Sequence, residues 1–304
     1  MRTHRGLARA ACTGLLLVAV ASACGPSLPA SAPSPSPSSS ISTLTPLPMP
    51  DMGPPEGKVV ADLRQASRDA ALNRFQVWIG NGLARDLDPT RIAYRDPRFP
   101  DPISGERLRL NPSGSERGYP LALPPRPVCA APRQGARGAV TIAFGARSIT
   151  VTVEDEADVV ERYVATRCLE FAVARVARLS FLDAVPPDSP GEGGVGTLTL
   201  VVRPSGTPGG RLTIDSVGGT PVLTPSKQSG WRPDVTVRSN GEVQRIELPV
   251  IPARCDGHAF LESGSATAFI VSLHLNGRAG EVVVRMSPEG AANAFAFARE
   301  SCGL

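Results

Sequence analysis

The sequence predicts an all-β protein built from two tandem immunoglobulin-like β-sandwich units, each with a short C-terminal helix and one disulfide. Composition and periodicity predict this class. Proline and glycine number 31 and 30 among 304 residues, while aromatic residues make only 5%, a balance that favours short strands and turns over long helices. Apolar residues also repeat with a period of two along many short segments, which is typical of strands with one buried face.

The first predicted unit covers residues 57–168. It ends in a hairpin, in which apolar residues alternate on both sides of a turn at Gly145, and then in a helix from Glu156 to Arg167 that stops on Cys168. Five strands are expected before the hairpin, at Val59–Leu63, Phe75–Ile79, Arg91–Tyr94, Arg107–Leu110 and Gly118–Leu123.

The second predicted unit covers residues 169–304 and repeats the plan. Its hairpin turns at Asn276-Gly277, a dipeptide that favours tight turns between strands. A final helix is expected to start with Ser287 as its cap and Pro288 at its first position, and to end at Cys302. The earlier strands are expected at Leu198–Val202, Leu212–Ile214, Val222–Leu223, Val235–Val237 and Val243–Leu248.

Four cysteines lie in these two units, namely Cys129, Cys168, Cys255 and Cys302. An even number in an exported chain indicates two disulfides, for which three pairings exist. A similar Leu-Pro segment precedes Cys129 and Cys255, and each of the other two cysteines follows a hairpin and a helix. This internal similarity predicts the pairs Cys129–Cys168 and Cys255–Cys302. Each bridge is expected to stabilise its unit by roughly 4 kcal/mol in the chain-entropy description.

Residues 1–23 have the features of a secretory signal peptide. Arg2, Arg5 and Arg9 precede the apolar stretch Ala10–Ala23, which is shorter than the roughly 20 residues needed to span a bilayer. The stretch ends in small residues directly before Cys24 and resembles the bacterial lipobox. That resemblance implies a diacylglycerol thioether and further acyl chains such as palmitate on Cys24, enough for stable anchoring. The alternative is ordinary cleavage that leaves Cys24 free.

Residues 24–56 form the expected tether between the lipid and the folded units. Gly25–Pro55 contains ten prolines and eight serines, a composition that cannot build a core and predicts disorder.

The charge balance argues against a nucleic-acid partner. The sequence has 32 Lys and Arg against 28 Asp and Glu, and cleavage of the signal peptide would remove three of the arginines. The remaining basic residues form no stripe of the kind that nucleic-acid-binding proteins usually have.

One cluster in the second unit offers metal-binding or acid–base chemistry. Asp256, His258 and Glu262 lie within seven residues, and a helical turn would place His258 beside Glu262. Against this hypothesis, Cys255 is used in a disulfide and metal sites usually need three or four ligands. The simpler interpretation is that these residues satisfy backbone groups in a loop, so no metal site is expected. His274, in an alternating strand, is expected to be a surface histidine.

Two other segments have features of binding sites. Gly191–Gly196 matches the pattern G-x-G-x-x-G, but a strand follows it where a dinucleotide site needs a helix, so a loop is expected. Trp231 falls in a Gly-Trp-Arg-Pro loop, where an exposed indole would be a recognition anchor. Trp78 is expected to serve packing.

The whole layout resembles uncharacterised actinobacterial lipoproteins, in which a lipobox and a Pro/Ser tether precede β-rich units with a terminal cysteine. The predicted protein is therefore lipid-anchored through Cys24 at the outer face of the cytoplasmic membrane. The predicted function is non-enzymatic binding or scaffolding in the cell envelope, with the membrane and an envelope protein or glycan as partners and no cofactor. The alternative is a metal-dependent or hydrolytic enzyme that uses Asp256, His258 and Glu262.

Overall fold

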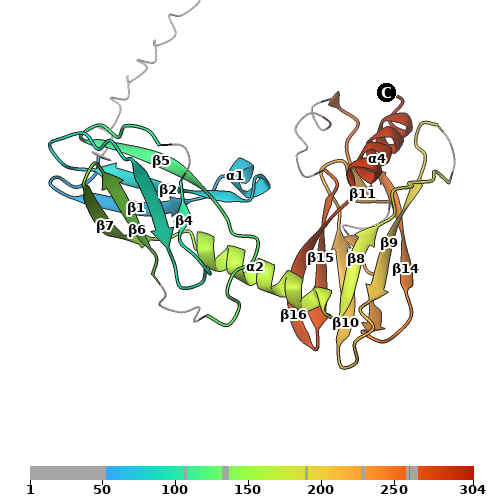
Figure 1. Cartoon of the computed structure of the whole chain (residues 1–304). Helices are drawn as coiled ribbons and strands as arrows, with labels where there is room; N and C mark the ends of the chain where they lie inside the picture. The colour runs from blue at the N-terminus through green and yellow to red at the C-terminus, as the bar shows by residue number, and fades with distance from the viewer. Residues whose placement is uncertain are drawn as a thin grey trace, which may run out of the picture. The chain divides into compact units, whose positions relative to one another are not determined.

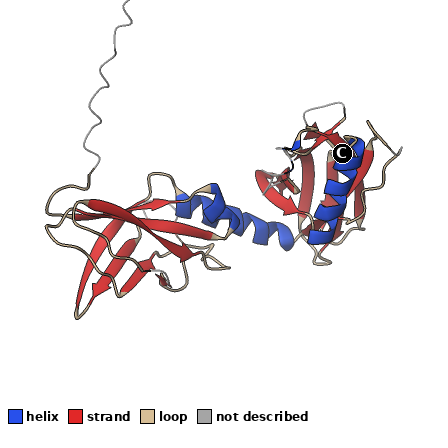
Figure 2. Ribbon diagram, turned by 90° about the horizontal axis from the view of Figure 1, so that it is seen from above, coloured by secondary structure: helices blue, strands red, loops and turns tan. Residues whose placement is uncertain are grey.

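The computed structural model has a mostly β fold in which strands far outnumber helices (Figures 1 and 2). The structure describes residues 53–105, 108–131, 137–188, 191–226, 230–257, 260 and 266–304. The predicted signal peptide, Cys24 and most of the tether lie outside these residues. Two separate clusters of buried apolar side chains divide the strands into a first β region, β1 to β7, and a second β region, β8 to β16.

The first β region has seven strands in one continuous hydrogen-bonded path, ordered β4-β3-β6-β7-β1-β2-β5. All pairs are antiparallel except β1 with β7, where Ala61 lies opposite Val153 in a parallel pairing. The elements are β1 Val59–Arg64, α1 Ser67–Ala71, β2 Arg74–Asn81, β3 Arg91–Arg95, β4 Ile103–Ser104, β5 Ser115–Ala122, β6 Ala139–Phe144 and β7 Arg147–Glu154.

These strands agree with the predicted ones with two exceptions: β4 was not predicted, and the strand predicted at Arg107–Leu110 does not form in its described part. Leu108–Leu110 are not in a strand, although their apolar residues alternate. Tyr119 donates its hydroxyl hydrogen to the Arg109 carbonyl at 2.8 Å, and Asn111 forms an isolated bridge with Leu87. The segment therefore bonds to its surroundings one group at a time rather than through a ladder.

A buried ion pair lies at the end of β3. Arg98 is 5% exposed and binds both carboxylate oxygens of Asp96 at 2.8 Å, while Tyr94 donates its hydroxyl hydrogen to Asp96 at 2.9 Å. Arg98 also reaches Glu161 on the following helix at 3.4 Å. Burial alone would raise the pKa of Asp96, but the hydrogen bonds from Arg98 and Tyr94 lower it below its usual value.

Helix α2, Val159–Ala174, runs six residues past Cys168, so the predicted helix end at that cysteine is wrong. The sequence after Cys168 contains good helix formers and neither glycine nor proline, so nothing there stops the helix. The start lies three residues later than expected, because the Asp155 carboxylate accepts hydrogen bonds from the Val159 and Val160 amides. Residues of α2 up to Cys168 join the first apolar cluster, and Val173 joins the second.

The second β region packs two sheets around one core. One sheet has the order β11-β14-β9-β8, and the other has β12-β10-β15-β16 with β13 also paired to β10. The strands are β8 Ala177–Phe181, β9 Gly196–Pro204, β10 Arg211–Gly218, β11 Leu223–Pro225, β12 Gly230–Trp231, β13 Val235–Arg238, β14 Gln244–Pro252, β15 Ala268–Leu275 and β16 Arg278–Arg285.

The C-terminal hairpin and helix follow the sequence prediction closely. Asn276 and Gly277 both have positive φ, as a two-residue turn between twisted strands requires. Helix α4, Pro288–Ser301, begins after Ser287, whose hydroxyl accepts a hydrogen bond from the Gly290 amide. Its buried side chains Ala294, Phe297 and Ala298 join the core of the second β region.

Candidate functional site

Both predicted disulfides are confirmed. Cys129 bonds to Cys168 and Cys255 bonds to Cys302, with Cα atoms 5.6 and 5.3 Å apart. One bond joins the segment after β5 to helix α2, and the other joins the segment after β14 to the residue that follows helix α4. The cysteines are therefore used in bridges and offer no thiolate for catalysis or metal binding.

Of the three residues Asp256, His258 and Glu262, the structure describes only Asp256. Asp256 accepts a hydrogen bond from the Arg254 guanidinium at 2.9 Å, and both side chains are about half exposed. His258 and Glu262 lie outside the described residues. Across the described part of the chain, no group of three His, Cys, Asp or Glu side chains is placed to hold a metal ion.

Other residues singled out from the sequence have surface or loop positions. His274 is exposed on the outer face of β15, with its Nδ1 atom 2.7 Å from an Asp215 carboxylate oxygen. Gly191 to Val195 form a turn and loop, and Gly196 starts β9, as expected. Trp78 is half-buried on the outer face of β2, where the Arg64 guanidinium lies 4.4 Å from the ring centre.

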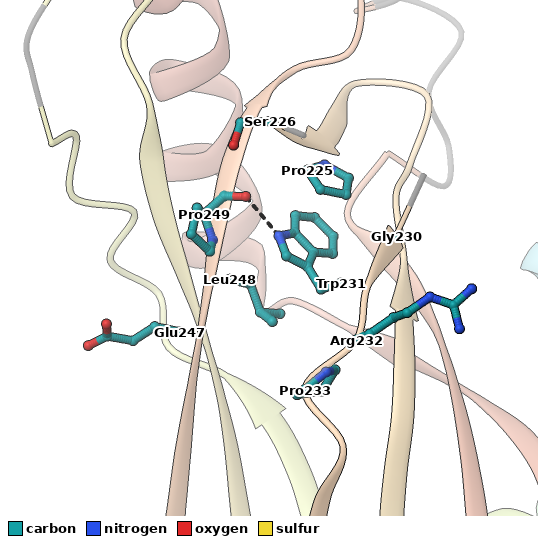
Figure 3. Close-up of a pocket in the computed structure, with 9 residues that line it drawn as sticks. All are labelled: Pro225, Ser226, Gly230, Trp231, Arg232, Pro233, Glu247, Leu248 and Pro249. Carbon is teal, nitrogen blue, oxygen red and sulfur yellow. Dashed lines mark hydrogen bonds between the residues drawn. The ribbon is translucent and has the colours of Figure 1, made fainter. Parts of the chain in front are cut away.

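Trp231 lies in a short strand rather than in the expected loop, and its indole is not exposed as a recognition anchor would be. It lies in β12 and is 7% exposed, and its ring packs against Phe269 in the core with centroids 6.3 Å apart. Its indole N–H donates to the Pro249 carbonyl at 2.7 Å, across the space between the two sheets (Figure 3). The short strand β12 turns this side chain inward because it pairs with β10.

A groove of about 320 Å³ lies beside this indole. Strand β14 forms one wall, with Glu247, Leu248 and Pro249, and the connection from β12 to β13 forms the other, with Arg232 and Pro233. Arg232 and Glu247 extend away from the indole on opposite sides (Figure 3). The remaining lining residues are Pro225, Ser226 and Gly230.

The groove is lined by both apolar and charged groups. Three prolines, Leu248 and the edge of Trp231 supply apolar area, and Glu247 and Arg232 supply one charge of each sign. The volume is at the lower end for small-molecule sites. Sequence reasoning missed this groove, because its walls come from distant segments that the pairing of β11 with β14 and of β12 with β10 brings together.

Comparison with known proteins gives only distant similarities. No protein-family model matches the chain, and no curated protein matches it. Among solved structures, the calcium-binding domain CBD12 of CALX1.1 is 13% identical over 71% of this chain and 76% of its own, with a TM-score of 0.20. CBD12 from CALX1.2 is 14% identical over 67% and 73%, with a TM-score of 0.17.

A red sea bream transglutaminase is 8% identical over 75% of this chain and 31% of its own, with a TM-score of 0.21. Scores of this size carry no inference about activity. In the described residues, no helix is long and apolar enough to cross a membrane.

Proposed function

We propose that this protein is a cell-surface lipoprotein, anchored through Cys24, that acts as a non-enzymatic binding module of the cell envelope. The observation that carries the binding role is the groove beside Trp231, where apolar surface and two opposite charges lie next to an incompletely paired strand. An envelope protein is the partner that such a surface suits best. Two disulfides agree with an oxidising compartment outside the cytoplasm.

The proposal includes two tandem immunoglobulin-like units. Immunoglobulin-like sandwiches place strands A, B and E in one sheet and C, F and G in the other. Strands β1-β2-β5 and β3-β6-β7 follow these orders in the first β region, and β8-β9-β14 and β10-β15-β16 follow them in the second. In both regions, the first cysteine follows the E-like strand, and the second lies in, or directly after, the helix that follows the G-like strand.

The anchoring part is tested by Cys24→Ala. This variant should appear in the medium or remain as an uncut precursor, whereas the unaltered chain stays with the membrane. Processed Cys24→Ala protein that remains on the membrane would refute the lipid anchor.

The binding part is tested by photo-crosslinking in the intact envelope. A crosslinkable amino acid at Pro233, in the groove wall, should give a discrete adduct with an envelope protein. The matched control is the same amino acid at Arg178, which is exposed on β8 at the opposite edge of the sheet that contains β14. Identical adducts at both positions, or none at Pro233, would contradict binding through the groove.

A further inference from the structure

Along the groove, β14 has an edge that no strand of the described residues covers. On one side it pairs with β9 from Gln244 to Val250. On the other side its partner β11 covers only Val250 to Pro252. Among the residues that the structure describes, no strand pairs with Gln244–Pro249 on the β11 side. An unpaired strand edge is a template for adding another strand.

The backbone direction shows which groups this edge offers. The Ala253 amide donates to the Val222 carbonyl at 2.8 Å, and the Pro249 carbonyl accepts from the Trp231 indole. The backbone polar groups of Pro249 and Ala253 therefore point toward the β11 side of the strand. Because these directions alternate along a strand, Arg245 and Glu247 point their N–H and C=O groups to the same side. Their side chains are exposed on the outer face of the sheet.

At its Pro249 end, this edge cannot form ladder hydrogen bonds. Pro249 has no N–H, and its carbonyl is already used by the indole of Trp231. An added antiparallel strand therefore makes its ladder bonds at Glu247 and Arg245. In such a pairing, the residue opposite Glu247 comes first along the incoming chain, and the residue opposite Arg245 comes two positions later.

Charge and burial then specify the incoming sequence. A basic residue opposite Glu247 and an acidic residue opposite Arg245 give two favourable cross-strand pairs, whereas the reverse order gives two like-charge pairs. The residue between them lies opposite Ile246, which is 7% exposed and faces the core side, so an apolar side chain fits there. The complementary sequence is thus basic–apolar–acidic.

We propose that this edge binds an extended segment of a partner protein by antiparallel strand addition, and that it recognises a basic–apolar–acidic tripeptide. This inference rests on the proposed binding role of the groove and specifies its ligand class and register. A single extended segment fits better than a folded sheet, because Arg232 and Pro233 line the groove across from β14. Main-chain bonds supply affinity and the alternate side chains supply specificity, as in other strand-addition complexes.

The chain itself provides a suitable probe. Residues 243–248 read Val-Gln-Arg-Ile-Glu-Leu, so this sequence is complementary to itself in the inferred register. A fluorescently labelled peptide of this sequence is titrated against the purified chain by anisotropy. The control peptide, Val-Gln-Glu-Ile-Arg-Leu, has the same composition with the charges exchanged. We expect it to bind on the order of tenfold more weakly.

A charge-swapped variant makes the test specific. Arg245→Glu combined with Glu247→Arg alters only exposed side chains, and it should reverse the preference between the two peptides. Equal binding of both peptides, no binding of either, or an unreversed preference would overturn strand addition in this register. If the Pro233 crosslink persisted in that case, the groove would still bind a partner and only the present inference would fail.

Self-association is the competing use of the same edge. Sedimentation velocity of the purified chain should show a monomer whether or not the charges are swapped. A dimer that is lost in the single variant Glu247→Arg would assign the edge to a second copy of the chain and overturn the proposal.

Discussion

Replacing Cys255 and Cys302 together by alanine is expected to destabilise the second β region by about 4 kcal/mol and to leave the first nearly unchanged. The bond closes a loop with a sequence separation of 47, and the chain entropy that it removes from the unfolded state sets this magnitude. The matched variant lacks Cys129 and Cys168, whose separation of 39 gives nearly the same value. The two variants therefore lose nearly the same free energy of unfolding and differ only in which β region loses its disulfide.

Hydrogen exchange resolved by peptide, measured under native conditions, reports this location. Without the second bridge, protection should fall in β9, β14 and β15 and persist in β2 and β5, since the two sets belong to different apolar clusters. The matched variant should show the opposite pattern, with an additional loss in α2 because Cys168 lies within that helix. An equal loss of protection in both regions after removal of either bridge would refute the idea of two separately stabilised units.

Three further predictions concern buried polar groups. Asp96→Asn should lower stability by about 3–5 kcal/mol in thermal unfolding, because it removes the carboxylate that binds the buried guanidinium of Arg98 at 2.8 Å and keeps only the longer ion pair with Glu161, and a loss below about 1 kcal/mol would contradict this. Hydrogen bonds lower the pKa of Asp96 and Asp69 in the folded protein. Their contribution to the free energy of unfolding is therefore complete above the unfolded-state pKa of about 3.9 and is lost as the pH falls below that value. Thermal unfolding midpoints that stay constant down to about pH 2 would contradict this prediction. Trp231→Phe keeps most of the packing but removes the donor to Pro249, so chemical denaturation should show a loss of about 1 kcal/mol, and unchanged stability would mean that the bond contributes nothing.

Sequence patterns predicted correctly those features whose structure depends on residues close together in the chain. The hairpin of β15 and β16 follows from alternation and from the Asn276-Gly277 turn, and α4 follows from Ser287 and Pro288. The disulfide pairing followed from internal similarity, which carries information between distant positions. In each case, the residues that define the feature are close in sequence or repeated in it.

Features that depend on distant partners could not be predicted in this way. Leu108–Leu110 alternate like a strand but have no ladder partner, and β8 forms at Ala177–Phe181 because β9 pairs with it. The inward orientation of Trp231 depends on β10, and the groove depends on how soon β11 ends. A single sequence contains no signal for the length of a strand pair whose members are far apart.

The order of the cysteines along the chain bears on how the protein matures. In a chain exported from its N-terminus, Cys129 and Cys168 emerge and can be oxidised before Cys255 and Cys302 arrive. Both bonds therefore join cysteines that are consecutive in the order of emergence. In the proposed lipoprotein, where lipid blocks the Cys24 thiol, an oxidase that pairs each new thiol with the previous free one would produce the native connectivity directly.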